Sequence, residues 1–194
     1  MNKKQMNIHR IGDTALIGEA ELYKFVQKAL PIKFRMNKSI DETVLKQSGK
    51  AELIYHPFWL AKTLVIAERP PFQPKKLPNM IFVDGVSGYR GVFSKVPAMS
   101  ELEVNKMDVQ PLVITNEEEA KKYIQDVQVR QINRSYLLKK PKHEIVEISI
   151  GYVPIWKVLI RTPMFHETFY INANTGESEK YMAQRWQSRK DLIS

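Results

Sequence analysis

A short aromatic unit, Tyr-x-Pro-x-Trp, occurs twice in this chain and constrains its fold more than any other feature. The first copy runs from Tyr55 to Trp59 and the second from Tyr152 to Trp156. The copies lie 97 residues apart, which is half of the 194-residue chain. Self-similarity at a fixed offset is typical of a structure built from related units. We therefore predict two related halves.

A strand-like segment and a polar turn follow each copy. Residues 81–84 lead into a turn that ends at Gly88, and residues 169–172 lead into one that ends at Gly176. An Asp or Asn at the end of a strand accepts hydrogen bonds from the turn backbone, and Gly closes the turn at positive φ. This pattern makes most of the conspicuous aromatic and turn residues structural.

Apolar spacing predicts a long helix ahead of each unit, over residues 18–30 and 116–138. Strands are expected at residues 51–67, broken or bulged at Pro57, and at 80–83, 89–96, 143–150, 152–161 and 168–171. The predicted fold class is α+β, with two related helix-plus-antiparallel-sheet halves. We place the first half at residues 1–110 and the second half, with a C-terminal tail, at residues 111–194.

The remaining segments carry weaker patterns. We expect a loosely docked start over residues 1–12, a short strand over residues 32–36 and a short amphipathic helix within residues 177–193. Residues 69–78 hold four prolines and a lysine pair, so we expect an extended loop there.

The second half, over residues 117–179, resembles a PepSY-type domain. In that family a helix precedes strands, and a strand ending in a V-D-x-x-T-G-like turn closes the unit. The matching residues here are 156–158 and 169–177, with Asn172 in place of the usual acid, and residues 81–88 match less closely. The resemblance implies this local fold and a binding or inhibitory module, of a kind found mostly outside the cytoplasm.

Composition narrows the possible chemistry. The chain has no cysteine, which excludes disulfides, thiolate zinc sites and cysteine nucleophiles. Its formal net charge of +9 favours anionic partners such as nucleic acid, although it also suits simple solubility. No apolar run has the length of a membrane helix, and no secretory signal is visible, so we expect a cytoplasmic protein.

Catalytic and metal-binding signatures do not stand out. The four histidines form no H-E-x-x-H pair, and no glycine-rich phosphate-binding motif occurs. Ser87 lacks the spacing of a nucleophile elbow, so we interpret it as a turn residue. We therefore predict no catalytic residue, no metal ligand and no cofactor, and leave an enzyme of unrecognised type as one alternative.

Two groups of side chains are candidates for binding a partner. Solvent-facing aromatic rings clamp peptides or stack on bases, whereas buried ones form the core. The aromatic candidates are Tyr55, Trp59, Tyr152 and Trp156. The others are basic residues, with Trp186 among them, which suit either nucleic-acid contacts or a solvated surface: Lys75, Lys76, Lys139, Lys140, Lys142, Arg185, Trp186 and Arg189.

The leading hypothesis is a non-enzymatic binding or regulatory module with a protein or peptide partner. The main alternative is a basic protein associated with nucleic acid. If the repeat determines the fold, function is best sought where the halves differ. Those places are the proline-rich basic segment at residues 69–78 and the basic tail that carries Trp186.

Overall fold

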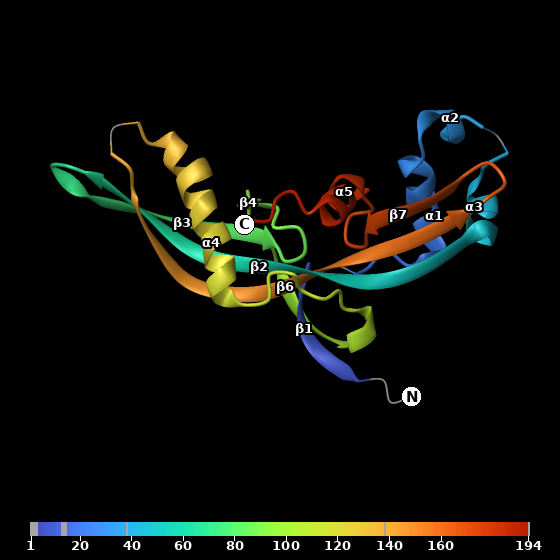
Figure 1. The fold of residues 1–194 in the computed structure, drawn as a ribbon, viewed down its shortest axis with the longest axis horizontal. Helices are drawn as coiled ribbons and strands as arrows, with labels where there is room; N and C mark the ends of the chain where they lie inside the picture. Colours follow the sequence, from blue (N-terminus) through green and yellow to red (C-terminus); the bar gives the residue numbers. More distant parts are fainter. Residues whose placement is uncertain (1–3, 13–14, 38, 138, 194) are drawn as a thin grey trace.

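Two very long strands form the middle of the molecule (Figure 1). The computed structural model describes residues 4–12, 15–37, 39–137 and 139–193. In it, β2 (Gly49–Arg69) and β6 (Lys142–Arg161) pair antiparallel along nearly their whole length. One strand comes from each predicted half, so a single mixed sheet joins the two. The α+β class is confirmed.

Shorter strands extend this central pair. β3 pairs with the outer part of β2, and β7 pairs with the outer part of β6, so each long strand carries its own antiparallel partner. β1 pairs antiparallel with β5 and contacts β6 at a single parallel position, Arg10 opposite Tyr152. These strands are β1 (Gln5–Ile11), β3 (Phe72–Asp84), β4 (Arg90–Val92), β5 (Met99–Asn105) and β7 (His166–Asn172).

The helices lie along the long strands, with α4 near one end, α1 to α3 near the other and α5 between them (Figure 1). Asn116 caps α4, because its side chain accepts a hydrogen bond from the Glu119 N–H. None of the helices in the described ranges is long and apolar enough to cross a bilayer. Their bounds are α1 (Glu19–Ala29), α2 (Ile32–Arg35), α3 (Glu42–Ser48), α4 (Glu117–Val127) and α5 (Lys180–Ser188), with short π and 3-10 segments at η1 (Lys106–Asp108), η2 (Gln128–Ile132) and η3 (Asn133–Ser135).

Each long helix packs against strands of the other predicted half. The α1 side chains Leu22, Tyr23 and Val26 share a core with Val158, Ile160, Phe169 and Ile171 of β6 and β7. The α4 side chains Ala120, Tyr123, Ile124 and Val127 share another with Trp59, Ala61, Ile81 and Val83 of β2 and β3. Burying these apolar faces is the main stabilising contribution of both helices. The halves therefore share their cores, while the boundary at residue 110 stays a prediction.

The predicted turns are confirmed. Gly88 and Gly176 have φ values of 76° and 77°, a region that side-chain-bearing residues rarely adopt. The tail helix is also confirmed, as α5. The helix predicted over residues 116–138 continues beyond α4 as π and 3-10 turns to Ser135, and residue 138 lies outside the described residues.

The prediction of an extended loop at residues 69–78 is wrong. The ladder between β2 and β3 continues to Arg69 opposite Phe72, and only Pro70 and Pro71 form the turn. The prolines in β3 are tolerated because β4 covers only the inner end of that strand, so the outer part is an edge without a further partner in the described sheet. The expected break at Pro57 is also wrong, since β2 continues through it.

Two predictions near the N-terminus are wrong as well. Within residues 1–12, the described part contains strand β1, because pairing with β5 satisfies its backbone and buries Ile8. Residues 32–36 form the single turn α2 instead of a strand. Pro31 precedes this turn, and proline is well tolerated at a helix start.

Candidate functional site

Asp84, at the end of β3, is the centre of a buried polar network. Its side chain is fully buried. Carboxylate Oδ1 accepts hydrogen bonds from the backbone N–H groups of Val86 at 2.8 Å and Ser87 at 2.9 Å. These two bonds shape the turn after β3, as the sequence predicts for an Asp at this position.

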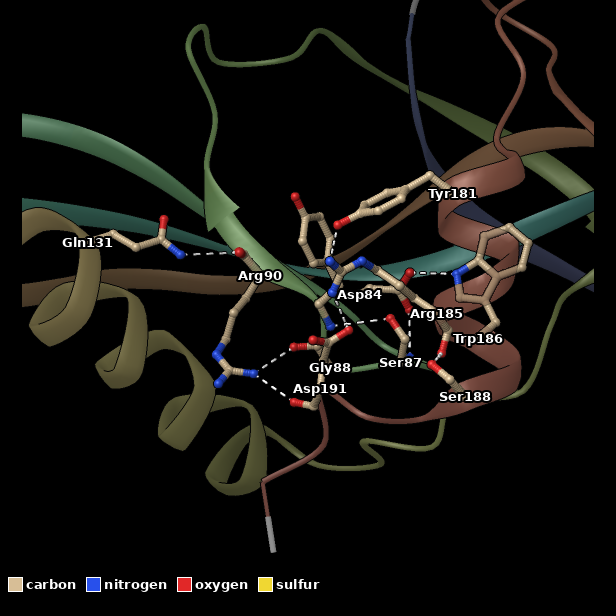
Figure 2. A network of polar contacts seen from close by, with 11 residues as sticks. Asp84, Ser87, Gly88, Arg90, Gln131, Tyr181, Arg185, Trp186, Ser188 and Asp191 are labelled. Atoms are coloured by element: carbon tan, nitrogen blue, oxygen red, sulfur yellow. Dashed lines mark hydrogen bonds and ion pairs between the residues drawn. The ribbon is translucent and has the colours of Figure 1, made fainter.

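The other carboxylate oxygen joins three distant segments. Oδ2 of Asp84 lies 2.9 Å from Nε2 of His56 on β2 and accepts a 2.7 Å hydrogen bond from Nε1 of Trp186 on α5. Figure 2 shows the Trp186 N–H directed at this carboxylate. The Trp186 ring also stacks on His56, with 4.2 Å between ring centroids, and the Gln110 amide faces His56 Nδ1.

The contacts of Asp84 stabilise its ionised form. Burial of the carboxyl group raises the pKa of Asp84, but the hydrogen bond and charge of His56, with the N–H groups of Ser87 and Trp186, outweigh burial. The pKa therefore lies below its ordinary value. The carboxylate accepts hydrogen bonds from four N–H groups, and both ring nitrogens of His56 have partners. This arrangement suits a structural role, in which Asp84 holds the segments together, better than a role in proton transfer.

The segment from α5 to the C-terminus has a second anchor close by (Figure 2). The Arg185 guanidinium lies over the rings of Tyr89 and Tyr181, at 4.3 and 4.4 Å from their centroids, and binds Asp191 at 2.5 Å. Arg90 donates to the Asp191 carbonyl oxygen at 2.8 Å. These contacts hold α5 across the middle of the sheet, beside Asp84.

Beside this network lies a pocket of about 540 Å³, which we call the central pocket. Phe58 and Val153 of the two long strands, Phe82 of β3 and Met182 of α5 supply apolar walls, and Phe58 also packs edge-on against His56. No charged side chain lines it among the described residues. The full lining is Ile11, Gly12, Phe58, Phe82, Tyr89, Phe93, Pro97, Ala98, Val153, Asn172, Asn174, Thr175 and Met182.

The polar part of the pocket wall comes from the turn after β7. Both polar atoms of the Asn172 side chain have a partner, since its amide donates to Glu179 at 2.9 Å and its oxygen accepts from the Asn174 N–H at 2.9 Å. Asn174 donates from Nδ2 to the Ile11 carbonyl oxygen at 2.9 Å, which fixes the orientation of its amide. Its Oδ1 is buried without a partner in the described structure. The pocket is thus apolar with one polar corner.

The aromatic candidates lie partly or fully inside the fold. Trp59 is only 7% exposed and donates from Nε1 to the Ile114 carbonyl oxygen at 2.9 Å, just before α4. The half-buried Trp156 donates in the same way to the Ile17 carbonyl oxygen at 2.8 Å, just before α1. Tyr55 and Tyr152 pack in one cluster against β1 and β5. Their predicted part in binding a partner stays a prediction.

The basic candidates divide into two places. Glu68 near the end of β2 pairs with Lys139 and lies 3.5 Å from the Lys142 ammonium, so the lysines after η3 lie beside the β2–β3 hairpin. That end of the molecule holds Lys75, Lys76, Lys139, Lys140 and Lys142. Arg185, Trp186 and Arg189 belong instead to α5 and its C-cap, in the middle of the sheet.

Sequence reasoning did not predict that His56 contacts Asp84, and it did not predict the residues that line the central pocket. The position of His56 inside the first Tyr-x-Pro-x-Trp unit, ahead of the strand that ends in Asp84, is a usable signal. Met182 and Val153 carry no such signal, because apolar residues of a helix and a strand predict a core as readily as a pocket.

The comparisons with known proteins give no further guide. No protein-family model, no curated protein and no solved structure matches this chain.

Proposed function

We propose that this protein is a non-enzymatic binding module that holds a small, uncharged, largely apolar molecule in the central pocket. The observation that carries this proposal is the pocket itself. Its volume of about 540 Å³ suits a small organic ligand, since such sites measure roughly 300–1,000 Å³ and are mostly apolar. Its walls hold no histidine or carboxylate among the described residues, which supports binding over catalysis. The PepSY-like resemblance, which also implies a binding module, stays a prediction.

Contacts at corresponding positions of the two aromatic units support the proposed repeat. Pro57 and Pro154 accept matching 2.9 Å hydrogen bonds from the N–H groups of Gly85 and Ala173, each just after its turn begins. The β2–β6 register pairs His56 with Val153, residues that lie 97 apart and correspond between the two aromatic units.

We infer that the pocket occurs where the related halves differ. In the first half His56 and Asp84 are covered by Trp186, which fills the space over them. At the corresponding positions of the second half stand Val153 and Asn172, and both line the open pocket. An apolar residue in place of His56 and a neutral one in place of Asp84 suit an uncharged ligand.

We expect the neutral fluorescent probe N-phenyl-1-naphthylamine to bind the pocket saturably, with one molecule per chain and a blue-shifted, enhanced emission. Val153→Phe places a ring inside the pocket and should weaken this binding by about tenfold or more, because the ring occupies space that the probe needs. Fluorescence titration of both proteins measures the effect.

Val129→Phe is the matched control, because Val129 is 62% exposed on the π turn after α4 and does not line the pocket. This variant should bind the probe like the natural protein. Equal probe binding by the Val153→Phe variant, with both variants folded by circular dichroism, would refute the pocket as the binding site.

A further inference from the structure

The β2–β3 hairpin ends in an apolar tip at one extreme of the elongated molecule (Figure 1). Its turn consists of Pro70 and Pro71, both exposed, and is followed by Phe72, a residue that is 73% exposed. Leu137, at 92% exposed, lies in the segment after η3 that the ion pair of Lys139 with Glu68 holds beside the hairpin. Exposed apolar residues that gather beside polar ones mark interaction surfaces, so the tip indicates a contact surface.

Basic side chains surround this tip. The strand registers place Lys76 and Lys142 on either side of Ile66, and Lys75 opposite Ala67. Lys140 donates to the carbonyl oxygens that end the helical segment before it, those of Asn133 and Tyr136. With Arg69, the surrounding set is Arg69, Lys75, Lys76, Lys139, Lys140 and Lys142.

Acidic residues balance only a small part of this charge. Glu68 is engaged by Lys139 and Lys142, Glu144 lies opposite Leu64, and Glu147, slightly farther from the tip on β6, pairs with Lys62. The end of the molecule is therefore strongly positive. Basic side chains around an apolar tip are complementary to a surface that is anionic outside and apolar inside.

We propose that this end of the molecule binds the surface of a lipid bilayer that contains anionic lipids. Phe72 and Leu137 enter the headgroup region, and the lysines contact the anionic headgroups, each basic residue strengthening the attraction. Single-stranded nucleic acid fits less well, because it needs successive aromatic stacking platforms in a basic groove, and an aliphatic side chain such as Leu137 provides none. This proposal is independent of the ligand in the central pocket.

The test is co-sedimentation with phosphatidylcholine vesicles that contain roughly a quarter phosphatidylglycerol, compared with vesicles of phosphatidylcholine alone. The natural protein should bind the anionic vesicles and dissociate as salt is raised from roughly 50 to 500 mM, because salt screens the attraction. The double variants F72S/L137S and K75E/K76E should each lower the partition coefficient about tenfold or more.

K24E/K46E is the matched control, since it changes the net charge equally at exposed positions on α1 and α3, at the other end of the molecule. It should retain most of the binding. Equal binding to neutral vesicles, no binding to anionic ones, or equal losses in the control variant would overturn the proposal. So would a gel shift with a single-stranded oligonucleotide that needs Lys75 and Lys76 but not Leu137, with no vesicle binding.

Discussion

Replacing Asp84 with alanine should lower the free energy of unfolding by about 4 kcal/mol, because it removes a buried carboxylate on which several N–H donors depend. Four N–H groups lose their acceptor at once: those of Val86, Ser87, His56 and Trp186. Each buried donor left unsatisfied costs roughly 1–3 kcal/mol, although the losses do not add fully. Urea unfolding followed by far-ultraviolet circular dichroism measures the change.

Asn172, which the proposed repeat aligns with Asp84, provides the control. Asn172→Ala removes the bonds to the Asn174 N–H and to Glu179, with no buried ion pair, and should cost only about 1 kcal/mol. A loss for Asp84→Ala no larger than that for Asn172→Ala would mean that the network around Asp84 is not what holds α5 to the sheet.

The pH dependence of stability provides a second test with the Asp84→Ala variant. The pKa of Asp84 is lower in the folded protein than its ordinary value of 3.8, so the ionised carboxylate stabilises the fold fully above that value. The contribution is lost as the pH falls through the lower, folded-state pKa. The stability gap between the natural protein and Asp84→Ala should therefore shrink below about pH 4. A gap that stays constant on acidification would contradict the ionised state of Asp84.

Replacing Trp59 with alanine should lower the free energy of unfolding by about 4 kcal/mol, within the usual range for a large buried aromatic residue. The ring packs between β2, β3 and α4, and its N–H satisfies the Ile114 carbonyl oxygen. Trp156→Ala should cost about half as much, because this ring is only partly buried. Trp59→Phe should cost roughly 1–2 kcal/mol, since most of the apolar area remains and the hydrogen bond is lost.

The same urea measurement separates these variants. If Trp59→Ala is no less stable than Trp156→Ala, the first aromatic unit does not contribute to the core in the way its burial indicates.

Features set by local spacing could be predicted from the sequence. The turns closed by Gly88 and Gly176 and the helix that begins after Asn116 depend on residues a few positions apart. The hairpin at residues 69–78 could not, because the effect of a strand proline depends on whether its edge is paired, and pairing is a long-range property.

The site depends still more on distant residues. Trp186 reaches Asp84 across 102 positions, and no local pattern indicates that contact. The central pocket brings together residues from Ile11 to Met182, and empty space between side chains is determined by packing across the whole sheet. The proposed repeat aligns His56 and Asp84 with Val153 and Asn172, and only the latter two line the central pocket.

The most direct test of the central pocket is a nuclear magnetic resonance titration of methionine methyl groups with N-phenyl-1-naphthylamine. Met182 lines the pocket, whereas Met36 and Met107 are 78% and 79% exposed elsewhere and serve as internal references. The Met182 resonance should shift saturably, at the same probe concentration as the fluorescence, and should need about tenfold or more probe to shift in the Val153→Phe variant. A Met182 resonance that does not move while the probe binds, or one that moves only together with Met36 and Met107, would contradict the proposed binding site.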